Sequence, residues 1–177
     1  MRDNSEPEPE ERFRSVFAHL AAVGAYARRR GSLDADAVAA ETMTIAWRRL
    51  ADVPQDDPVP WLLATARNLL LAEARRAGRV PRLREPDEAV AAAELQELDP
   101  QLERALRALP PRDREALLLV AWEDLTPSQA ARVLGVNATA FRVRLLRARR
   151  RLRASLAVAA EAPRPAPQAV HADVEGT

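Results

Sequence analysis

The sequence predicts an all-α protein, and three observations support this prediction. Ala, Leu, Val and Arg dominate the chain, and Ala, Leu and Arg lose little conformational freedom on entering a helix. Glycine occurs only 5 times in 177 residues, and few stretches combine the β-branched and aromatic residues typical of strands. Apolar residues recur at helical spacing in segments separated by Gly or Pro. The length suits one mid-sized domain or two small ones.

The N-terminal part of the chain predicts helices separated by a long loop. Residues 1–10 are expected to be disordered. One helix is then expected up to Gly31, where three arginines at its negative end precede a glycine stop. Its predicted buried stripe consists of Phe13, Val16, Phe17, Leu20, Val23 and Ala27.

Asp34 is predicted to cap a second helix that ends near Trp47. The inward-facing residues of that helix are Val38, Thr42, Ile45 and Ala46. The segment 51–60 holds three prolines and three aspartates and predicts a loop. A third helix is expected over 61–76, and we predict an interdomain linker over 80–98.

A helix-turn-helix is the clearest motif of the chain. Thr126 is predicted to cap the helix 127–134, with Pro127 in the first turn and Gln129 completing a capping box. Gly135 ends this helix, and Asn137 caps the next one after a tight turn. A short helix, a turn containing Gly and a longer helix is the order found in helix-turn-helix proteins. The tail 158–177 is rich in Pro and Ala and is expected to be disordered.

The charge distribution predicts that the second helix of the helix-turn-helix binds a polyanion. The net charge is only +1, yet residues 125–160 hold eight arginines and no acidic residue. By contrast, residues 85–99 hold six acidic residues and residues 1–11 hold five against a single Arg. All 27 basic residues are arginine, a bias that a GC-rich genome also produces. The acidic Glu103, Asp113 and Glu115 stand beside arginines, which we interpret as solvated helical faces.

The second helix of the motif has one face for the core and one for DNA. At 100° per residue, the core stripe is Phe141, Leu145, Ala148, Leu152 and Leu156. Thr139, Arg142 and Val143 point away from that stripe and are predicted to read base edges, since recognition helices read bases with their N-terminal residues. Phosphate contacts are predicted for Arg144, Arg147, Arg149 and Arg150. Asn137 at the start of the helix is also predicted to contact the DNA. The alternative is an exposed Arg-rich helix with no ligand.

The C-terminal segment resembles region 4 of extracytoplasmic-function (ECF) sigma factors. The resemblance rests on Leu109-Pro110, Arg112, Arg114, Glu115, the run 116–119, Leu134-Gly135-Val136 and the run 144–152. It implies a domain over 99–157 that binds the −35 promoter element and the flap of the polymerase β subunit. Three positions are less usual for the family, namely Asn137, Ala138 and Phe141, so we expect an individual promoter preference.

The N-terminal segments 34–50 and 60–76 resemble region 2 of the same family. This resemblance implies a helical bundle over 11–79 that binds core polymerase and the −10 element. Core binding through the β′ clamp helices is implied for Asp36, Glu41 and Trp47. Contacts with the −10 element are implied for Asp56, Trp61, Arg67, Asn68, Arg75 and Arg76. Ala37 and Ala40 stand where the family has an acidic residue and a glutamine that help to grip the clamp, so we expect weaker or redistributed core contacts.

Together these observations predict an ECF-type sigma factor of the sigma-70 family, which directs polymerase to promoters and assists −10 melting. The expected partners are core RNA polymerase, promoter DNA and an anti-sigma factor. The alternatives are a helix-turn-helix regulator that binds duplex DNA without polymerase, and an interaction module that sequesters a protein partner.

No enzyme, cofactor or metal site is predicted. The chain lacks cysteine and carries only His19 and His171, and it shows no Gly-rich phosphate loop or nucleophile elbow. Its N-terminus has no apolar core of a signal peptide, and no run approaches the roughly 18 apolar residues of a membrane span. We therefore expect a cytoplasmic protein without membrane insertion.

Overall fold

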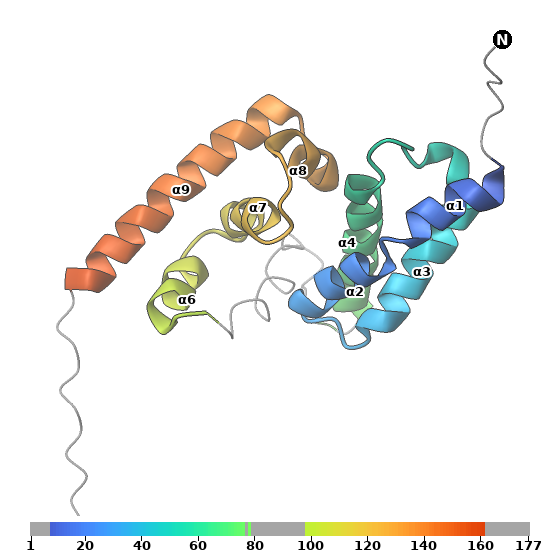
Figure 1. Ribbon diagram of the computed structural model, residues 1–177. Helices are drawn as coiled ribbons and strands as arrows, with labels where there is room; N and C mark the ends of the chain where they lie inside the picture. Colours follow the sequence, from blue (N-terminus) through green and yellow to red (C-terminus); the bar gives the residue numbers. More distant parts are fainter. Residues whose placement is uncertain (1–7, 77, 79–97, 162–177) are drawn as a thin grey trace, which may run out of the picture.

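The structure is a computed structural model that describes residues 8–76, 78 and 98–161. Every regular element in these ranges is a helix, which confirms the all-α prediction (Figure 1). Helices α1 to α4 form an N-terminal group, and α6 to α9 form a C-terminal group. Most of the predicted linker, and the tail from residue 162 onward, lie outside the described residues.

The single first helix predicted from the sequence is wrong, because the structure divides it into α1 (Pro9–Phe17) and α2 (Leu20–Arg29). The His19 amide donates to the Val16 carbonyl three residues back, so the helix tightens and breaks at this point. Phe17 is therefore 47% exposed, although the predicted stripe buried it. Val16, Val23 and Ala27 are buried as predicted.

Helix α1 begins at Pro9, inside the segment 1–10 that was expected to be disordered. Proline is favoured at the first helical position because its missing N–H is not needed there. Glu10 and Glu11 in the first turn complement the positive end of the helix dipole. Both features favour a helix start that the high polarity of the segment concealed.

Helix α3 (Ala35–Arg48) begins at the predicted cap, since the Asp34 Oδ1 accepts a hydrogen bond from the Ala37 amide at 2.8 Å. A short 3-10 helix (Leu50–Asp52) opens the predicted loop, and α4 (Val59–Arg76) follows it. Helices α2, α3 and α4 pack against one another around Tyr26 and Leu62, which are fully buried.

The C-terminal group consists of α6 (Pro100–Arg107), α7 (Pro111–Ala121), α8 (Pro127–Leu134) and α9 (Ala138–Glu161). Helix α9 packs against α6, α7 and α8, and it lies away from α1 and α3 in Figure 1. Phe141, Leu145 and Ala148 are buried in this contact, which confirms the first three residues of the predicted core stripe. Leu152 and Leu156 are only partly buried.

Helix α9 continues to Glu161, although the disordered tail was expected to begin at residue 158. The residues concerned, Val-Ala-Ala-Glu, are mostly strong helix formers. Pro163 follows two residues after the helix end, and the residue before a proline disfavours the α conformation. The composition of the tail therefore changes only after the helix has ended.

The helix-turn-helix is formed by α8 and α9 with the predicted caps. The Thr126 Oγ1 accepts from the Gln129 amide at 3.3 Å, and the Gln129 Oε1 accepts from the Thr126 amide at 2.8 Å. Gly135 ends α8 in the left-handed region at φ 64°, and the Asn137 Oδ1 accepts from the Ala140 amide at 2.7 Å. All three features were predicted from local sequence.

Thr126→Ala is expected to reduce the free energy of unfolding by about 1 kcal/mol, because the Gln129 amide loses its side-chain acceptor. Equilibrium denaturation followed by circular dichroism measures the change. Ser128→Ala on the same exposed turn is the matched control and should stay within about 0.5 kcal/mol of the unchanged chain. An equal effect of the two substitutions would show that the capping box contributes no stability.

Candidate nucleic-acid interface

The outward face of α9 carries the residues predicted to read the −35 element. Thr139, Arg142 and Val143 are exposed in the first turns of the helix, as the face analysis predicted. Leu146, one turn further on, is exposed as well. Because the core residues hold the opposite face, this face of α9 is open to a partner.

Arginine is concentrated along the same helix. Arg147, Arg149 and Arg150 are exposed, and Arg144 is partly exposed. Arg151 forms an ion pair with Asp113, which joins α9 to α7. Asn137 uses its side-chain oxygen for the cap of α9, so its predicted contact with DNA would have to come from its remaining amide group.

The residues predicted for the −10 element lie in the loop before α4 and along α4. Asp56, Asn68, Arg75 and Arg76 are exposed. Trp61 is partly buried against the core, and the guanidinium of Arg49 lies 5.9 Å from its ring centroid. An exposed amide on a mostly apolar helix is compatible with the polar role predicted for Asn68.

Arg67 differs from these residues, because it is engaged with the other helical group. Its Nε and Nη2 donate to the two carboxylate oxygens of Glu115 on α7, at 2.7 and 3.1 Å. Arg30, at the end of α2, donates to the same carboxylate at 3.5 Å. Glu115 is only 4% exposed.

The interpretation of Asp113 and Glu115 as members of a solvated face is therefore wrong. Both are buried, together with Arg114 between them. The Arg-flanked acidic residues look like an exposed helix in the sequence, because their partners Arg30, Arg67 and Arg151 lie at least 38 residues away along the chain. Nothing local to this segment indicates such partners.

Asp57 is a further residue that the sequence analysis did not single out. Its carboxylate accepts from the Gln129 side-chain amide of α8 at 3.1 and 3.2 Å, and it forms an ion pair with Arg132. The neighbouring Asp56, which was predicted as a site residue, is exposed. The loop before α4 is thus held to the first helix of the helix-turn-helix.

The residues implied in core binding do not share one face of α3. Asp36 forms an ion pair with Arg28 of α2 at 3.1 Å, and the Trp47 ring stacks edge-on against Phe13 of α1 at 5.0 Å between centroids. Glu41 lies about 140° around the helix from Asp36 at 100° per residue. The structure therefore brings Asp36 and Trp47 to one side and Glu41 to another.

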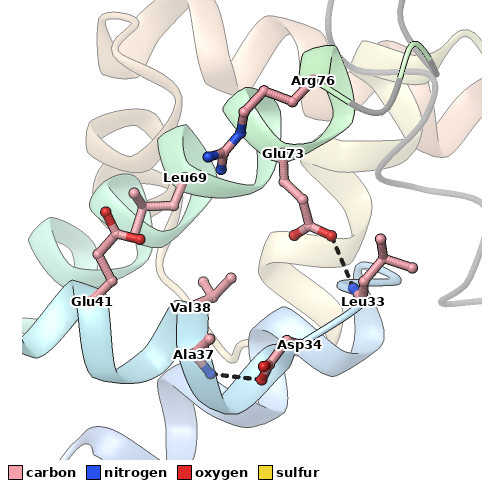
Figure 2. A pocket seen from close by; sticks show the side chains of 8 residues that line it. All are labelled: Leu33, Asp34, Ala37, Val38, Glu41, Leu69, Glu73 and Arg76. Carbon is pink, nitrogen blue, oxygen red and sulfur yellow. Dashed lines mark hydrogen bonds between the residues drawn. The ribbon is translucent and has the colours of Figure 1, made fainter.

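Glu41 lines a pocket of about 270 Å³ between α3 and the end of α4 (Figure 2). Glu73 forms one side and accepts from the Leu33 amide at 3.0 Å and the Ser32 hydroxyl at 3.1 Å. Ala37, one of the two positions that depart from the region 2 pattern, lies on the wall of this pocket. The alanine at position 37, which departs from the region 2 pattern, thus lies on an accessible surface and not in the core.

Comparison with known proteins agrees with the motif in α8 and α9. Residues 100–152 match the family described as Sigma-70, region 4. The match spans α6, α7, α8 and most of α9, which includes the whole helix-turn-helix. No curated protein sequence matches the chain.

Solved structures with a similar fold extend the likeness to both helical groups. The sigma factor RpoE from Bartonella quintana, in complex with the anti-sigma factor NepR, is 25% identical, with a TM-score of 0.56 over 82% of this chain and 96% of that one. CnrH, in complex with the cytosolic domain of CnrY, is 26% identical, with a TM-score of 0.56 over 86% and 91%. The chain is therefore similar to sigma factors, in sequence through region 4 and in fold through both helical groups. Its likeness is to the ECF type, as the sequence predicted.

A third structure shares the fold of this chain. The PhyRSL–NepR complex from Sphingomonas sp. Fr1 has a TM-score of 0.55 over 93% of this chain and 99% of that one, at 20% identity. We refer below to α1–α4 as region 2 and to α6–α9 as region 4. Sigma factors act as regulators of transcription.

Among the described helices of this chain, none has the length and apolar character that crossing a membrane requires.

Proposed function

We propose that this sigma factor directs core RNA polymerase to its promoters by reading the −35 element with α9 and engaging the −10 element with α4. The observation that carries the proposal is the capped helix-turn-helix of region 4, whose recognition helix presents an exposed Arg-rich face. Residues 125–160 hold no acidic residue, so DNA phosphates would meet no negative side chain along α9 before its last residue, Glu161. The factor itself is expected to perform no catalysis.

Base and phosphate contacts are proposed for different residues of α9. Thr139, Arg142 and Val143 lie at its N-terminal end, where a recognition helix meets base edges in the major groove. Arg142 suits guanine, and the Val143 methyl groups suit the thymine methyl. The later residues Arg144, Arg147 and Arg150 are proposed to bind phosphates, which set affinity and not sequence.

Contacts with the −10 element are proposed for α4 and the loop before it. A base that leaves the stack costs a few kcal/mol, which an aromatic or polar pocket can offset without hydrolysis. Trp61, Asn68 and the exposed Asp56 are the groups proposed to lie beside such a base. Arg75 and Arg76, both exposed at the end of α4, are proposed to bind the backbone.

Two protein partners are part of the proposal. Core polymerase is proposed to bind region 2 through Asp36, Glu41 and Trp47 of α3, all of which are exposed. An anti-sigma factor is proposed because the similar sigma factor RpoE is solved in complex with one, NepR. A factor with these partners works in the cytoplasm, beside the polymerase.

Reconstitution tests the proposed function. The purified chain is added to core RNA polymerase, and promoter-specific open complexes are measured by permanganate footprinting on genomic promoter fragments. A holoenzyme that selects start sites is the expected result. Binding to palindromic DNA by a dimer, with no holoenzyme formed, would overturn the proposal in favour of a conventional helix-turn-helix regulator.

Arg142→Ala is expected to alter the −35 sequence preference, with a loss of about 1–3 kcal/mol of discrimination at one base pair. Holoenzyme binding to a promoter library randomised in the −35 element measures this preference. Arg147→Ala is the matched control and should weaken binding equally for all sequences, with a smaller salt dependence. If Arg142→Ala also weakens all sequences equally, Arg142 contacts only phosphates.

A further inference from the structure

Regions 2 and 4 contact each other through charged side chains that lie out of solvent. The centre of the contact is the carboxylate of Glu115, which Arg67 binds in bidentate geometry and whose Oε1 also accepts from Arg30. The Arg30 side chain is only 1% exposed and that of Glu115 only 6%. An ion pair at this depth is screened far less by salt than one on the surface.

Two further contacts join region 2 to region 4. Arg29 donates to both carboxylate oxygens of Glu123, at 3.2 and 2.5 Å, and the Glu123 side chain is 7% exposed. Asp57 holds Gln129 and Arg132 of α8, as described above. Helices α4 and α8 lie side by side along this contact (Figure 1).

At Glu115 and Glu123 the interface places carboxylates of region 4 on guanidinium groups of region 2. A bidentate guanidinium recognises carboxylate and phosphate with the same geometry. Arg67 is one of the residues implied in −10 binding, and Glu115 occupies its fork in this structure. The loop before α4 is held at the same time by Asp57. By contrast, the reading face of α9 remains exposed.

We infer that region 4 is an internal competitor for the −10 strand: Glu115 and Glu123 occupy the Arg29–Arg30–Arg67 surface that the backbone of single-stranded DNA would otherwise bind. When the two regions are in contact, which we call the closed state, the exposed face of α9 is available to the −35 element. The arginine surface of region 2 is covered in this state. Separation of the two regions is then required before the −10 strand binds. The inference deepens the proposed function and rests on it for the identity of the DNA.

Glu115→Gln tests this inference in the full chain. Removing the charge takes away the carboxylate that both Arg30 and Arg67 bind, which disfavours the closed state. The matched control is Glu103→Gln, which changes the net charge equally but breaks only a pair with Arg107 within α6. Because the chain has no cysteine, Ser15→Cys and Arg153→Cys provide unique sites for a fluorescent donor and acceptor on α1 and α9.

Two measurements on the chain alone are expected to agree. Energy transfer between the labels should fall in Glu115→Gln and stay unchanged in Glu103→Gln. A fluorescent single-stranded DNA of random sequence should bind Glu115→Gln about tenfold more tightly than Glu103→Gln, because a larger fraction of the chain is competent to bind. The same DNA, added to the unsubstituted chain, should lower the energy transfer.

A second variant keeps the test decisive if Glu115→Gln fails to fold. Glu123 follows the end of α7, so Glu123→Gln weakens the interface without disturbing that helix and should shift both measurements in the same direction by a smaller factor. DNA binding without a fall in energy transfer, or labels that are equally close in all variants, would overturn the inference. Neither measurement uses polymerase, so failure of holoenzyme formation would overturn the proposed function and leave the closed arrangement standing.

Discussion

Phe141→Ala is expected to destabilise region 4 by about 3–5 kcal/mol, the usual cost of removing a fully buried aromatic ring. Phe141 is 0% exposed and lies one turn after the cap of α9, on the face that packs against the rest of region 4. An alanine there leaves a cavity inside the helix-turn-helix. A domain of about 60 residues has a free energy of unfolding of only about 3–9 kcal/mol. This one side chain therefore accounts for at least about a third of the stability of region 4.

Urea denaturation followed by far-ultraviolet circular dichroism measures this loss, and −35 binding by the holoenzyme should fall with it. Leu146→Ala is the matched control for stability, since Leu146 lies on the same helix but is half exposed. It should change the free energy of unfolding by no more than about 0.5 kcal/mol. A cost below about 1 kcal/mol for Phe141→Ala would contradict the assignment of this face of α9 to the core.

The features of region 4 that were predicted correctly are all local. The capping box of Thr126 and Gln129, the left-handed Gly135 and the Asn137 cap each depend on residues within four positions of one another. The burial of Phe141 followed from helical periodicity, which is also local. The exposed face of α9 could be predicted for the same reason, because one face is determined once the other is buried.

The break between α1 and α2 could not be predicted in this way. The residues at the break are Ala18 and His19, and neither is a Gly or a Pro. Apolar residues continue at helical spacing across it. Proline and glycine are the residues that end a helix through their own conformational preferences. In region 2, α1 and α2 each pack against α3. The sequence shows only a continuous stripe.

The contact between regions 2 and 4 escaped prediction for a related reason. Glu115 lies 48 residues from Arg67 and 85 from Arg30 along the chain. Arg67 was predicted as a DNA-binding residue from resemblance, and the structure shows which group it binds when region 4 is closed on it. A single sequence predicts which residues carry charge, but their pairing depends on tertiary structure.

Leu62→Ala is expected to destabilise region 2 by about 2–5 kcal/mol, because Leu62 is fully buried near the start of α4. Leu69→Ala on the same helix is the matched control: Leu69 is partly exposed and lines the pocket in Figure 2, so its truncation opens no closed cavity. Amide hydrogen exchange measured by mass spectrometry separates the effects on the two regions.

In Leu62→Ala, the distribution of lost amide protection between the two regions shows whether they fold separately. Region 4 has its own core of Phe141, Leu145 and Ala148, so amides in α7 to α9 should keep their protection when those in α2 to α4 lose it. Unfolding of region 2 also removes the partners of Glu115, Glu123 and Gln129, so within region 4 only amides beside these residues should exchange faster. Equal loss of protection throughout both regions would mean that they unfold as one cooperative unit. Separation of the regions would then require unfolding, and the internal competition inferred from Glu115 would not operate in the native chain.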